Sequence, residues 1–210
     1  MMRLKDRADL YARRFPDYPP VVCHCDWLYG VWMIGACYKR TNDLYGAYPP
    51  SYLQRVHSMF PDKTHILHLF SGGLTEKVAV WEANSGIGRL GGVTTPFAEL
   101  VDAHGPDEGR HPTKQCDVTK LPWKGRLFNL VLVDPPYSKE DAAKYGDKTV
   151  PAHKVFEEAH RVTEDGAFLV WLDQKLPMYK KALWKLVGTI GLVRSTNHRF
   201  RLVSIFERQG

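Results

Sequence analysis

Short apolar runs that stop at an aspartate or a glycine turn constrain the fold of this chain more than any other feature. Two such runs end at Asp102 and Asp134, a shorter and more polar candidate strand, residues 114–116, ends at Asp117, and residues 65–70 end at the turn Ser71-Gly72-Gly73. Runs of this length and composition predict buried strands followed by tight turns. Because helical patterns alternate with the strands, we expect a mostly parallel sheet covered on both faces. All these aspartates would then lie at the carboxyl edge of the sheet, where such folds bind ligands.

Hydrophobic periodicity and proline positions predict further elements. The expected helices are a helix or arm within residues 1–20, a helix after Ser51 as N-cap, one from Pro151 to about Asp165, and one over Tyr179–Val187. The other expected strands are residues 167–172 and a terminal antiparallel pair, 191–193 with 200–206. Residues 21–38 show no clear period and predict no element.

The length of 210 residues suits one globular domain. No stretch approaches the roughly 18 apolar residues of a membrane helix, and the first residues are polar, so we expect a cytoplasmic protein without membrane contact. Cys23, Cys25, Cys37 and Cys116 lack the spacing of paired zinc ligands, and we expect thiols and no metal site. Single histidines such as His65 and His68 are expected to pack in the core.

The formal charge of +6 is concentrated at the end of the chain. From Trp171 onward there are eight basic and two acidic residues, so this segment carries the whole excess. Lysine and arginine bind polyanions by releasing counterions, which suggests a nucleic-acid partner. A solvated, lysine-rich surface is the alternative reading.

The strongest local signal is Asp134-Pro135-Pro136-Tyr137, directly after an apolar strand. Two prolines cannot continue a strand ladder and they fix the backbone, so the aspartate and the tyrosine are held on a rigid turn. Such a turn can present a carboxylate, a free carbonyl and an aromatic face to one planar ligand. An ordinary proline turn with a capping aspartate is the other interpretation.

Together these motifs resemble the class I S-adenosylmethionine-dependent methyltransferases, specifically the D-P-P-Y amino-methyltransferases that act on exocyclic amines of bases. The resemblance implies a Rossmann-like α/β sheet, mostly parallel with a terminal antiparallel strand pair. It implies S-adenosylmethionine as cofactor and S-adenosylhomocysteine as product. Residues 48–210 would form the methyltransferase domain, with residues 1–47 as an N-terminal extension packed on it.

The resemblance also implies roles for individual residues. The catalytic group is Asp134, Pro135, Pro136 and Tyr137. The cofactor-binding group is Tyr48, Pro49, Phe70, Ser71, Gly72, Gly73, Asp102, Asp117 and Val118, with Asp102 near the ribose and Asp117 near the adenine amine. The substrate-binding group is Ser138 and Tyr145, after the proline turn, together with Arg194, His198, Arg199 and Arg201. These last four are predicted from the charge of the C-terminal segment and are expected to hold the phosphate backbone of the nucleic acid. One departure is Leu74, which stands where the family motif F-x-G-x-G has its last glycine.

Residue chemistry agrees with this resemblance. A base amine is a poor nucleophile because its lone pair is delocalised, so acceptors at Asp134 and the Pro135 carbonyl would align it for methyl transfer. Tyr137 would stack on a base turned out of the duplex. Residues 138–150 are a candidate lid or a plain surface loop.

The resemblance implies methylation of adenine N6 in DNA, because D-P-P-Y rather than S-P-P-Y is the family tendency for adenine. We expect a loose sequence preference, since the chain has no room for the separate target-recognition domain that sequence-specific DNA methyltransferases usually carry. DNA is favoured over RNA as partner, and the protein would be a monomer or homodimer. The alternatives are methylation of RNA or another amine, including cytosine N4, and a catalytically silent nucleic-acid-binding protein of the same fold. The glycine pattern of residues 86–91 fits a dinucleotide motif, but Pro96 and β-branched residues follow it, which disfavours the helix that motif requires.

Overall fold

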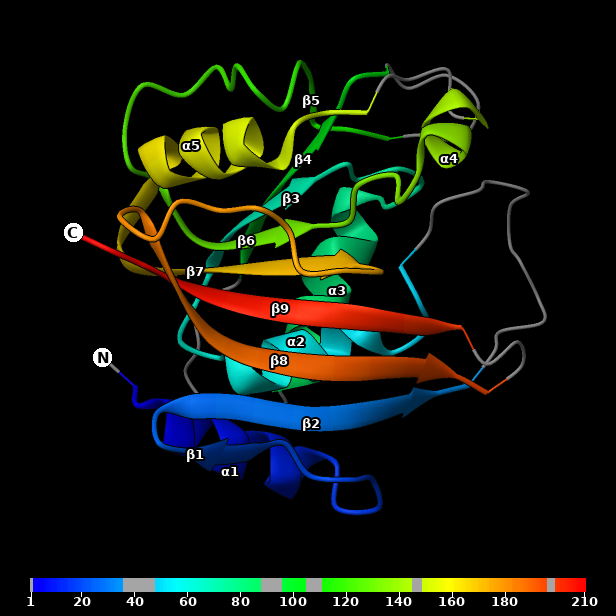
Figure 1. The fold of residues 1–210 in the computed structure, drawn as a ribbon, viewed down its shortest axis with the longest axis vertical. Coiled ribbons are helices and arrows are strands. Elements are labelled where there is room, and N and C mark those ends of the chain that lie inside the picture. The colour runs from blue at the N-terminus through cyan, green and yellow to red at the C-terminus, as the bar shows by residue number, and fades with distance from the viewer. Residues whose placement is uncertain (1, 36–47, 88–95, 105–110, 145–148, 196–198) are drawn as a thin grey trace.

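The computed structural model of the protein describes residues 2–35, 48–87, 96–104, 111–144, 149–195 and 199–210, and it contains a nine-stranded sheet with helices on both faces (Figure 1). The helices are α1 (Leu4–Arg14), α2 (Tyr52–Met59), α3 (Glu76–Ile87), α4 (Lys139–Lys144) and α5 (Ala152–Val162). The strands are β1 (Val22–His24), β2 (Trp27–Ile34), β3 (His65–Leu69), β4 (Phe97–Asp102), β5 (Lys114–Gln115), β6 (Phe128–Val133), β7 (Thr163–Asp173), β8 (Trp184–Arg194) and β9 (Phe200–Arg208). The expected Rossmann-like α/β fold is confirmed.

The strand order is β1-β2-β8-β9-β7-β6-β3-β4-β5, and the order reverses around β3. β4 pairs parallel to one edge of β3, and β6 pairs parallel to the other edge. The chain therefore leaves β3 and β6 at neighbouring positions, and the Asp134 N–H donates to the Leu69 carbonyl at 3.5 Å. Ligands of open α/β sheets bind at such a reversal, so the fold itself marks this edge.

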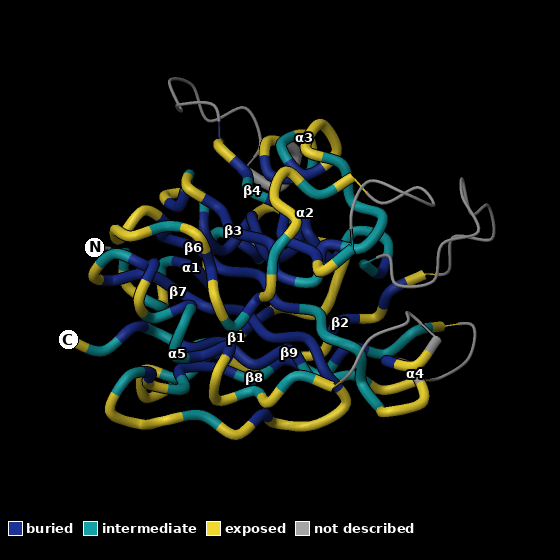
Figure 2. Tube along the Cα trace, turned by 90° about the horizontal axis from the view of Figure 1, so that it is seen from above, coloured by how far each residue is buried: buried dark blue, intermediate teal, exposed yellow. Residues whose placement is uncertain are grey.

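The two faces of the sheet carry separate cores. One core lies between the sheet and helices α1, α2 and α3, and the other lies between the sheet and α5. In Figure 2 the strands form the buried centre of the molecule, and the exposed segments lie at its margins. No helix in the part of the chain that the structure describes is long and apolar enough to cross a membrane.

The C-terminal antiparallel pair is confirmed, and β9 lies between β7 and β8. The helix predicted over Tyr179–Val187 is wrong. Leu183 and Trp184 both donate to the Lys180 carbonyl in a single turn, and β8 then begins. β8 pairs with both β2 and β9, and the buried Trp184 indole donates to the Phe156 carbonyl at 3.0 Å. These long-range contacts outweigh the local helical preference.

The N-terminal helix is present as α1, and residues 22–34 of the stretch without a period form the hairpin β1–β2. β2 pairs parallel to β8 and so extends the same sheet. Its residues Leu28, Trp32 and Ile34 are buried in the core beside α1 and α2. Tyr29, Val31 and Met33, on its other face, are about half exposed. Because both faces of β2 are apolar, its sequence lacks the alternation that identifies a strand.

Other expectations need correction. Ser51 precedes α2, but its φ is 60° and its side chain makes no capping hydrogen bond; the Pro49 carbonyl accepts the Tyr52 N–H instead. Helix α5 ends at Val162, before the predicted Asp165, because β7 already begins at Thr163. His68 is buried as predicted, but His65 is exposed at the start of β3.

Two further sequence features can be placed in part. Gly86 and Ile87 end α3 and residues 88–95 lie outside the described residues, so a helix rather than a strand leads into this glycine pattern. Cys23, Cys25 and Cys116 are free thiols, and Cys37 lies outside the described residues.

A pair of buried histidines links α2 to β3. His57 and His68 are fully buried, and neither ring has a hydrogen-bond partner among the described residues. Burial lowers the pKa of each to about 3, and for His68 a charge on His57 would lower it further. Both rings are therefore neutral in the folded protein at any pH near neutrality.

We expect this pair to make the fold sensitive to acid. The folded pKa values lie below the ordinary 6.5, so the stabilisation is complete above pH 6.5 and is lost as the pH falls toward 3. At pH 5 the loss would be about 2 kcal/mol for each histidine. Chemical denaturation at pH 7 and pH 5 measures it, with the double variant His57→Leu, His68→Leu as comparison. Equal pH sensitivity of the double variant and the wild type would contradict this assignment.

Candidate active site

The turn after β3 has an unusual backbone. Phe70 has a φ of 60° and Gly72 has a φ of 52°, and only the glycine adopts this left-handed conformation without strain. The turn is held by the next strand: the Ser71 N–H donates to the Val101 carbonyl at 3.1 Å. The Asp102 carboxylate accepts the Gly72 N–H at 2.9 Å. A strained residue held by its surroundings is typical of a functional site.

The turn after β6 lies beside it and carries Asp134-Pro135-Pro136-Tyr137. The Tyr137 hydroxyl donates to an Asp134 carboxylate oxygen at 2.5 Å. The guanidinium carbon of Arg201 lies 4.6 Å from the centre of the Tyr137 ring. The carboxylate, the phenol and the cation thus form one connected group at the reversal point of the sheet.

Burial is the main influence on Asp134. It raises the pKa of this carboxyl to about 6, while the nearby Arg201 charge and the Tyr137 hydrogen bond act in the opposite direction. Burial and the Asp134 charge also raise the pKa of Tyr137, which remains protonated as a donor. A carboxyl with this pKa is mostly ionised at neutral pH. A small change in pH or in the nearby charges therefore alters the fraction that is ionised.

Two more tyrosines face this carboxylate from the segment that leads into α2. Tyr48 stacks on Tyr52 with ring centres 5.4 Å apart, and it meets His68 edge-on at 5.9 Å. Both tyrosine hydroxyls are buried without a hydrogen-bond partner among the described residues. Burial and the charge of Asp134 raise the pKa of both. Pro49 is buried beside them.

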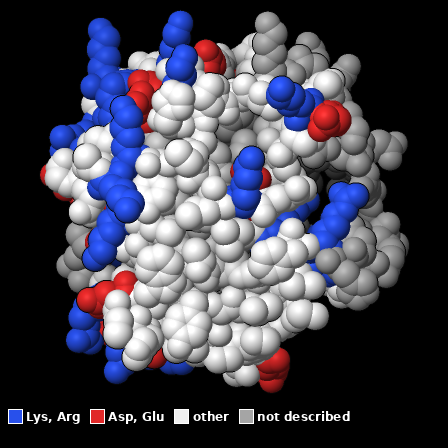
Figure 3. Space-filling view, viewed as in Figure 1, with Lys and Arg blue, Asp and Glu red and all other residues white. Residues whose placement is uncertain are grey.

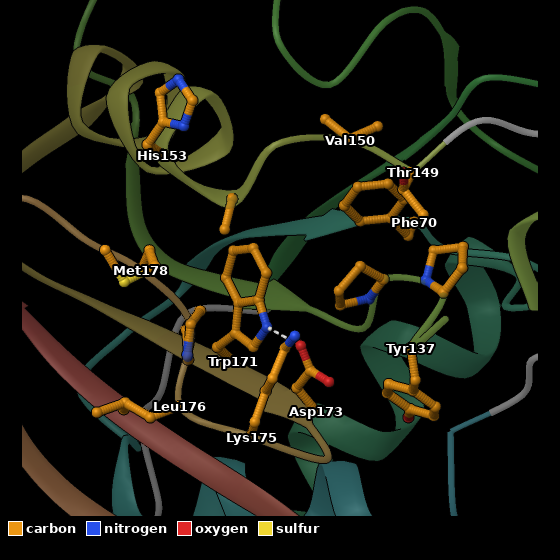
Figure 4. A pocket seen from close by; sticks show the side chains of 14 residues that line it. Phe70, Tyr137, Thr149, Val150, His153, Trp171, Asp173, Lys175, Leu176 and Met178 are labelled. Atoms are coloured by element: carbon orange, nitrogen blue, oxygen red, sulfur yellow. Dashed lines mark hydrogen bonds between the residues drawn. The ribbon is translucent and has the colours of Figure 1, made fainter. Parts of the chain in front are cut away.

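A cavity of about 540 Å³ opens next to the proline turn (Figure 4). Its walls come from Phe70 after β3, Pro135 to Tyr137 after β6, Trp171 and Asp173 at the end of β7, the segment from Lys175 to Met178, and the start of α5. The Trp171 indole donates to the Asp173 carboxylate at 3.3 Å, the interaction dashed in Figure 4. An aromatic and proline lining with a few polar groups suits a planar ligand with a polar edge.

The remaining predicted residues lie in varied positions. Asp117 is exposed after β5 and accepts hydrogen bonds from Thr119, whereas Val118 is buried in the core beside α5. The Ser138 carbonyl accepts the Ala142 N–H in α4. Arg194 donates its backbone N–H to the Arg199 carbonyl where β8 meets β9. Tyr145 and His198 lie outside the described residues.

A few Lys and Arg side chains lie where β8 meets β9, on the right of the view in Figure 3, and a longer row of them lies on the left side; the broad area of β9, β8 and β2 carries few charges.

The sequence did not single out Trp171, Asp173 or Tyr52 as site residues. A signal for Asp173 was present, since it ends a fourth apolar strand in the same manner as Asp134. Tyr52 had no such signal, because only the folded helix brings it to the carboxylate.

Comparison with known proteins reveals similarity in structure. No family model and no curated protein matches the sequence. A Listeria monocytogenes protein assigned to the class I S-adenosylmethionine-dependent methyltransferases aligns with a TM-score of 0.51 and 16% identity, over 78% of this chain and 61% of that one. This chain has the fold of a class I methyltransferase.

Two further structures align at lower scores. TrmN from Thermus thermophilus has a TM-score of 0.48 and 14% identity, over 76% of this chain and 49% of TrmN, so the chain spans about half of its length. YhhF from Escherichia coli, titled a methyltransferase, has a TM-score of 0.46 and 15% identity, over 81% of this chain and 93% of that one.

The hydrogen bond between Tyr137 and Asp134 predicts the effect of one substitution. Tyr137→Phe removes a donor that stabilises the charged carboxylate, so the Asp134 carboxyl should titrate about one pH unit higher than in the wild type. Carbon NMR of aspartate-labelled protein measures this titration, and Asp134→Asn identifies the signal. Tyr18→Phe, at an exposed tyrosine, is the matched control. An unchanged Asp134 titration would show that the hydrogen bond does not form in solution.

Proposed function

We propose that this protein transfers a methyl group from S-adenosylmethionine to the exocyclic N6 amine of adenine in DNA. The observation that carries the proposal is the position of Asp134-Pro135-Pro136-Tyr137 beside the turn at Phe70 to Gly73, at the reversal point of a methyltransferase-type sheet. The cavity next to this turn has the aromatic walls that a flat base would need.

The residues of the β3 turn fit the cofactor. The Ser71 hydroxyl is buried without a hydrogen-bond partner among the described residues, so it can bond to a ligand at this turn. The Asp102 carboxylate accepts the N–H groups of Gly72 and His104 with one oxygen each, which leaves lone pairs for hydroxyl donors. Phe70 to Gly73 and Asp102 would hold the cofactor, which supplies the electrophilic methyl group.

The chemistry asked of the protein is alignment of the amine. Without substrate, one Asp134 oxygen accepts a hydrogen bond from the Tyr137 hydroxyl. An entering amine would donate one hydrogen bond to this carboxylate and a second one to the Pro135 carbonyl. Two such acceptors direct the nitrogen lone pair toward the methyl group. Positioning of this kind can lower the activation free energy by several kcal/mol. The proton released on methylation can pass to Asp134, whose pKa of about 6 suits a transient acceptor.

Labelled methyl transfer to DNA, followed by nucleoside analysis, tests the reaction. Label in N6-methyladenine is expected. Label in N4-methylcytosine, preferential labelling of RNA or a free amine, or no label would each reject the DNA adenine assignment. Competition by DNA, RNA and nucleosides in the same assay identifies the preferred substrate class.

Asp134→Ala separates a catalytic role from a structural one. We expect turnover to fall by about 100-fold or more, because the variant loses the acceptor that aligns the amine. The affinity for S-adenosylhomocysteine, measured by calorimetry, should stay within a few-fold of the wild type, since the cofactor would be held by the β3 turn. Equal loss of turnover and of cofactor affinity would mean that Asp134 is structural.

Asp102→Ala tests the cofactor site. S-adenosylhomocysteine should raise the unfolding temperature of the wild type by mass action. The variant leaves the Gly72 N–H without its charged acceptor, so we expect an affinity loss of about tenfold or more. Asp17→Ala, at an exposed aspartate before β1, should behave as the wild type. A wild-type protein that is not stabilised by this ligand would contradict the cofactor assignment and favour a silent binding protein.

A further inference from the structure

We propose that Arg201 is a positioning residue of the candidate site: its guanidinium holds the Tyr137 ring against Asp134 and supplies the counter-charge of that carboxylate. The inference rests on the proposed function and deepens it. The sequence predicts a contact between Arg201 and the phosphate backbone of the substrate, and the geometry points to a different role.

The strand register directs Arg201 into the site. In β9 it lies opposite Leu192 of β8, whose side chain belongs to the core beside α1 and α2. Side chains of directly opposed residues share a face of the sheet, so Arg201 lies on the α2 face, where Tyr52 also lies. The Arg201 side chain is half-buried, and its guanidinium carbon is 4.6 Å from the centre of the Tyr137 ring.

This arrangement places a cation over an aromatic face at contact distance. A guanidinium stacks well on such a ring, and the attraction strengthens where water is excluded. The opposite end of the tyrosine is also fixed, because its hydroxyl donates to Asp134. Arg201 and Asp134 therefore hold Tyr137 from two sides, which orients the ring for stacking on a substrate base.

The charge of Arg201 also acts on the carboxylate itself. The titratable and charged groups that face Asp134 come from four places: Tyr137 on the same turn, Arg201 on β9, Asp173 at the end of β7, and Tyr48 with Tyr52 at the start of α2. Arg201 is the strongest influence that opposes burial in setting the Asp134 pKa, whereas Asp173 acts in the same direction as burial. Loss of the cation would favour the protonated acid, whose hydroxyl oxygen is a much poorer acceptor of an amine hydrogen than a carboxylate oxygen.

Two substitutions separate charge from shape. Arg201→Gln removes the charge, and Arg201→Lys keeps the charge but loses the planar stack. Lys181→Gln, at an exposed lysine before β8, removes one positive charge elsewhere and is the matched control. If Arg201→Gln does not fold, as judged by circular dichroism, Arg201→Lys carries the test, because its weakened stack should still reduce turnover.

The first readout is the titration of Asp134 in the protein without substrate, by carbon NMR with Asp134→Asn to identify the signal. We expect Asp134 in Arg201→Gln to titrate about one pH unit higher than in the wild type. Arg201→Lys and Lys181→Gln should titrate within a few tenths of a unit of the wild type. An unchanged Asp134 titration in Arg201→Gln overturns the proposal.

The second readout is methyl transfer as a function of pH and salt. The wild-type rate should rise through a pH of about 6, where Asp134 ionises, and fall about tenfold from its plateau by pH 5. In Arg201→Gln this rise should move up by about one pH unit, with KM for DNA within a few-fold. In Arg201→Lys the profile should keep its position while turnover falls about tenfold. Unchanged turnover in Arg201→Lys overturns the positioning role.

A phosphate contact predicts another pattern. Loss of one such contact lowers the slope of log affinity against log salt by about one and weakens DNA binding without moving the pH profile. That result would overturn the proposal and support a contact between Arg201 and the phosphate backbone of the DNA. If the wild type transfers no methyl group, the proposed function fails, while the Asp134 titration still decides whether Arg201 supplies the counter-charge.

Discussion

The parallel pairing of β3 with both β4 and β6 is the constraint on which the candidate site depends. It aligns Leu67 with Glu99 on one side and with Val131 on the other, so three chain segments leave the sheet together. The Phe70 turn, the Asp102 carboxylate and the proline turn are consequently neighbours without any direct link in sequence. A slip of one residue in either pairing would move every side chain of the shifted strand to the opposite face of the sheet, and the two turns and the Asp102 carboxylate would no longer lie together.

Burial then gives the assembled residues their chemical character. The Asp134 residue is half-buried, and its carboxylate accepts a hydrogen bond from Tyr137 and acts electrostatically on Tyr48 and Tyr52. Burial makes the charged form of the carboxyl costly, and the cation of Arg201, from a distant strand, offsets part of this cost. The site thus combines groups from the start of α2, from β6 and from β9, which are joined only in the folded chain.

The sequence predicted those parts of the fold that depend on local pattern. Apolar runs ending at Asp102 and Asp134 identified β4 and β6, and two prolines identified the turn, because the turn conformation is set by the residues themselves. It did not predict β2 or the start of β8, since these strands exist through pairing with each other and have no local polarity pattern. Ser51 has the residue type of an N-cap, but its backbone is left-handed and its side chain makes no capping hydrogen bond, so the turn between the Pro49 carbonyl and the Tyr52 N–H begins the helix instead.

The same distinction between local pattern and long-range contact applies to the residues of the candidate site. Residues within the two turns could be predicted from motifs. Tyr52 and Trp171 could not, because their contribution arises from the packing of one helix and one strand end against the turns. For Arg201 the sequence indicated only a positive charge, and the strand register places this half-buried charge on the face of the sheet where it acts on the Asp134 carboxylate.

The pairing of β2 with β8 has a consequence for the handling of this protein. β8 is a long, largely apolar strand, and β2 occupies the edge that would otherwise present its unbonded amides and carbonyls to solvent. A version shortened to begin near Tyr48 would uncover this ladder, and uncovered ladders recruit other chains into aggregates. The first 35 residues therefore protect the edge of β8, and we expect their removal to make the protein prone to aggregation.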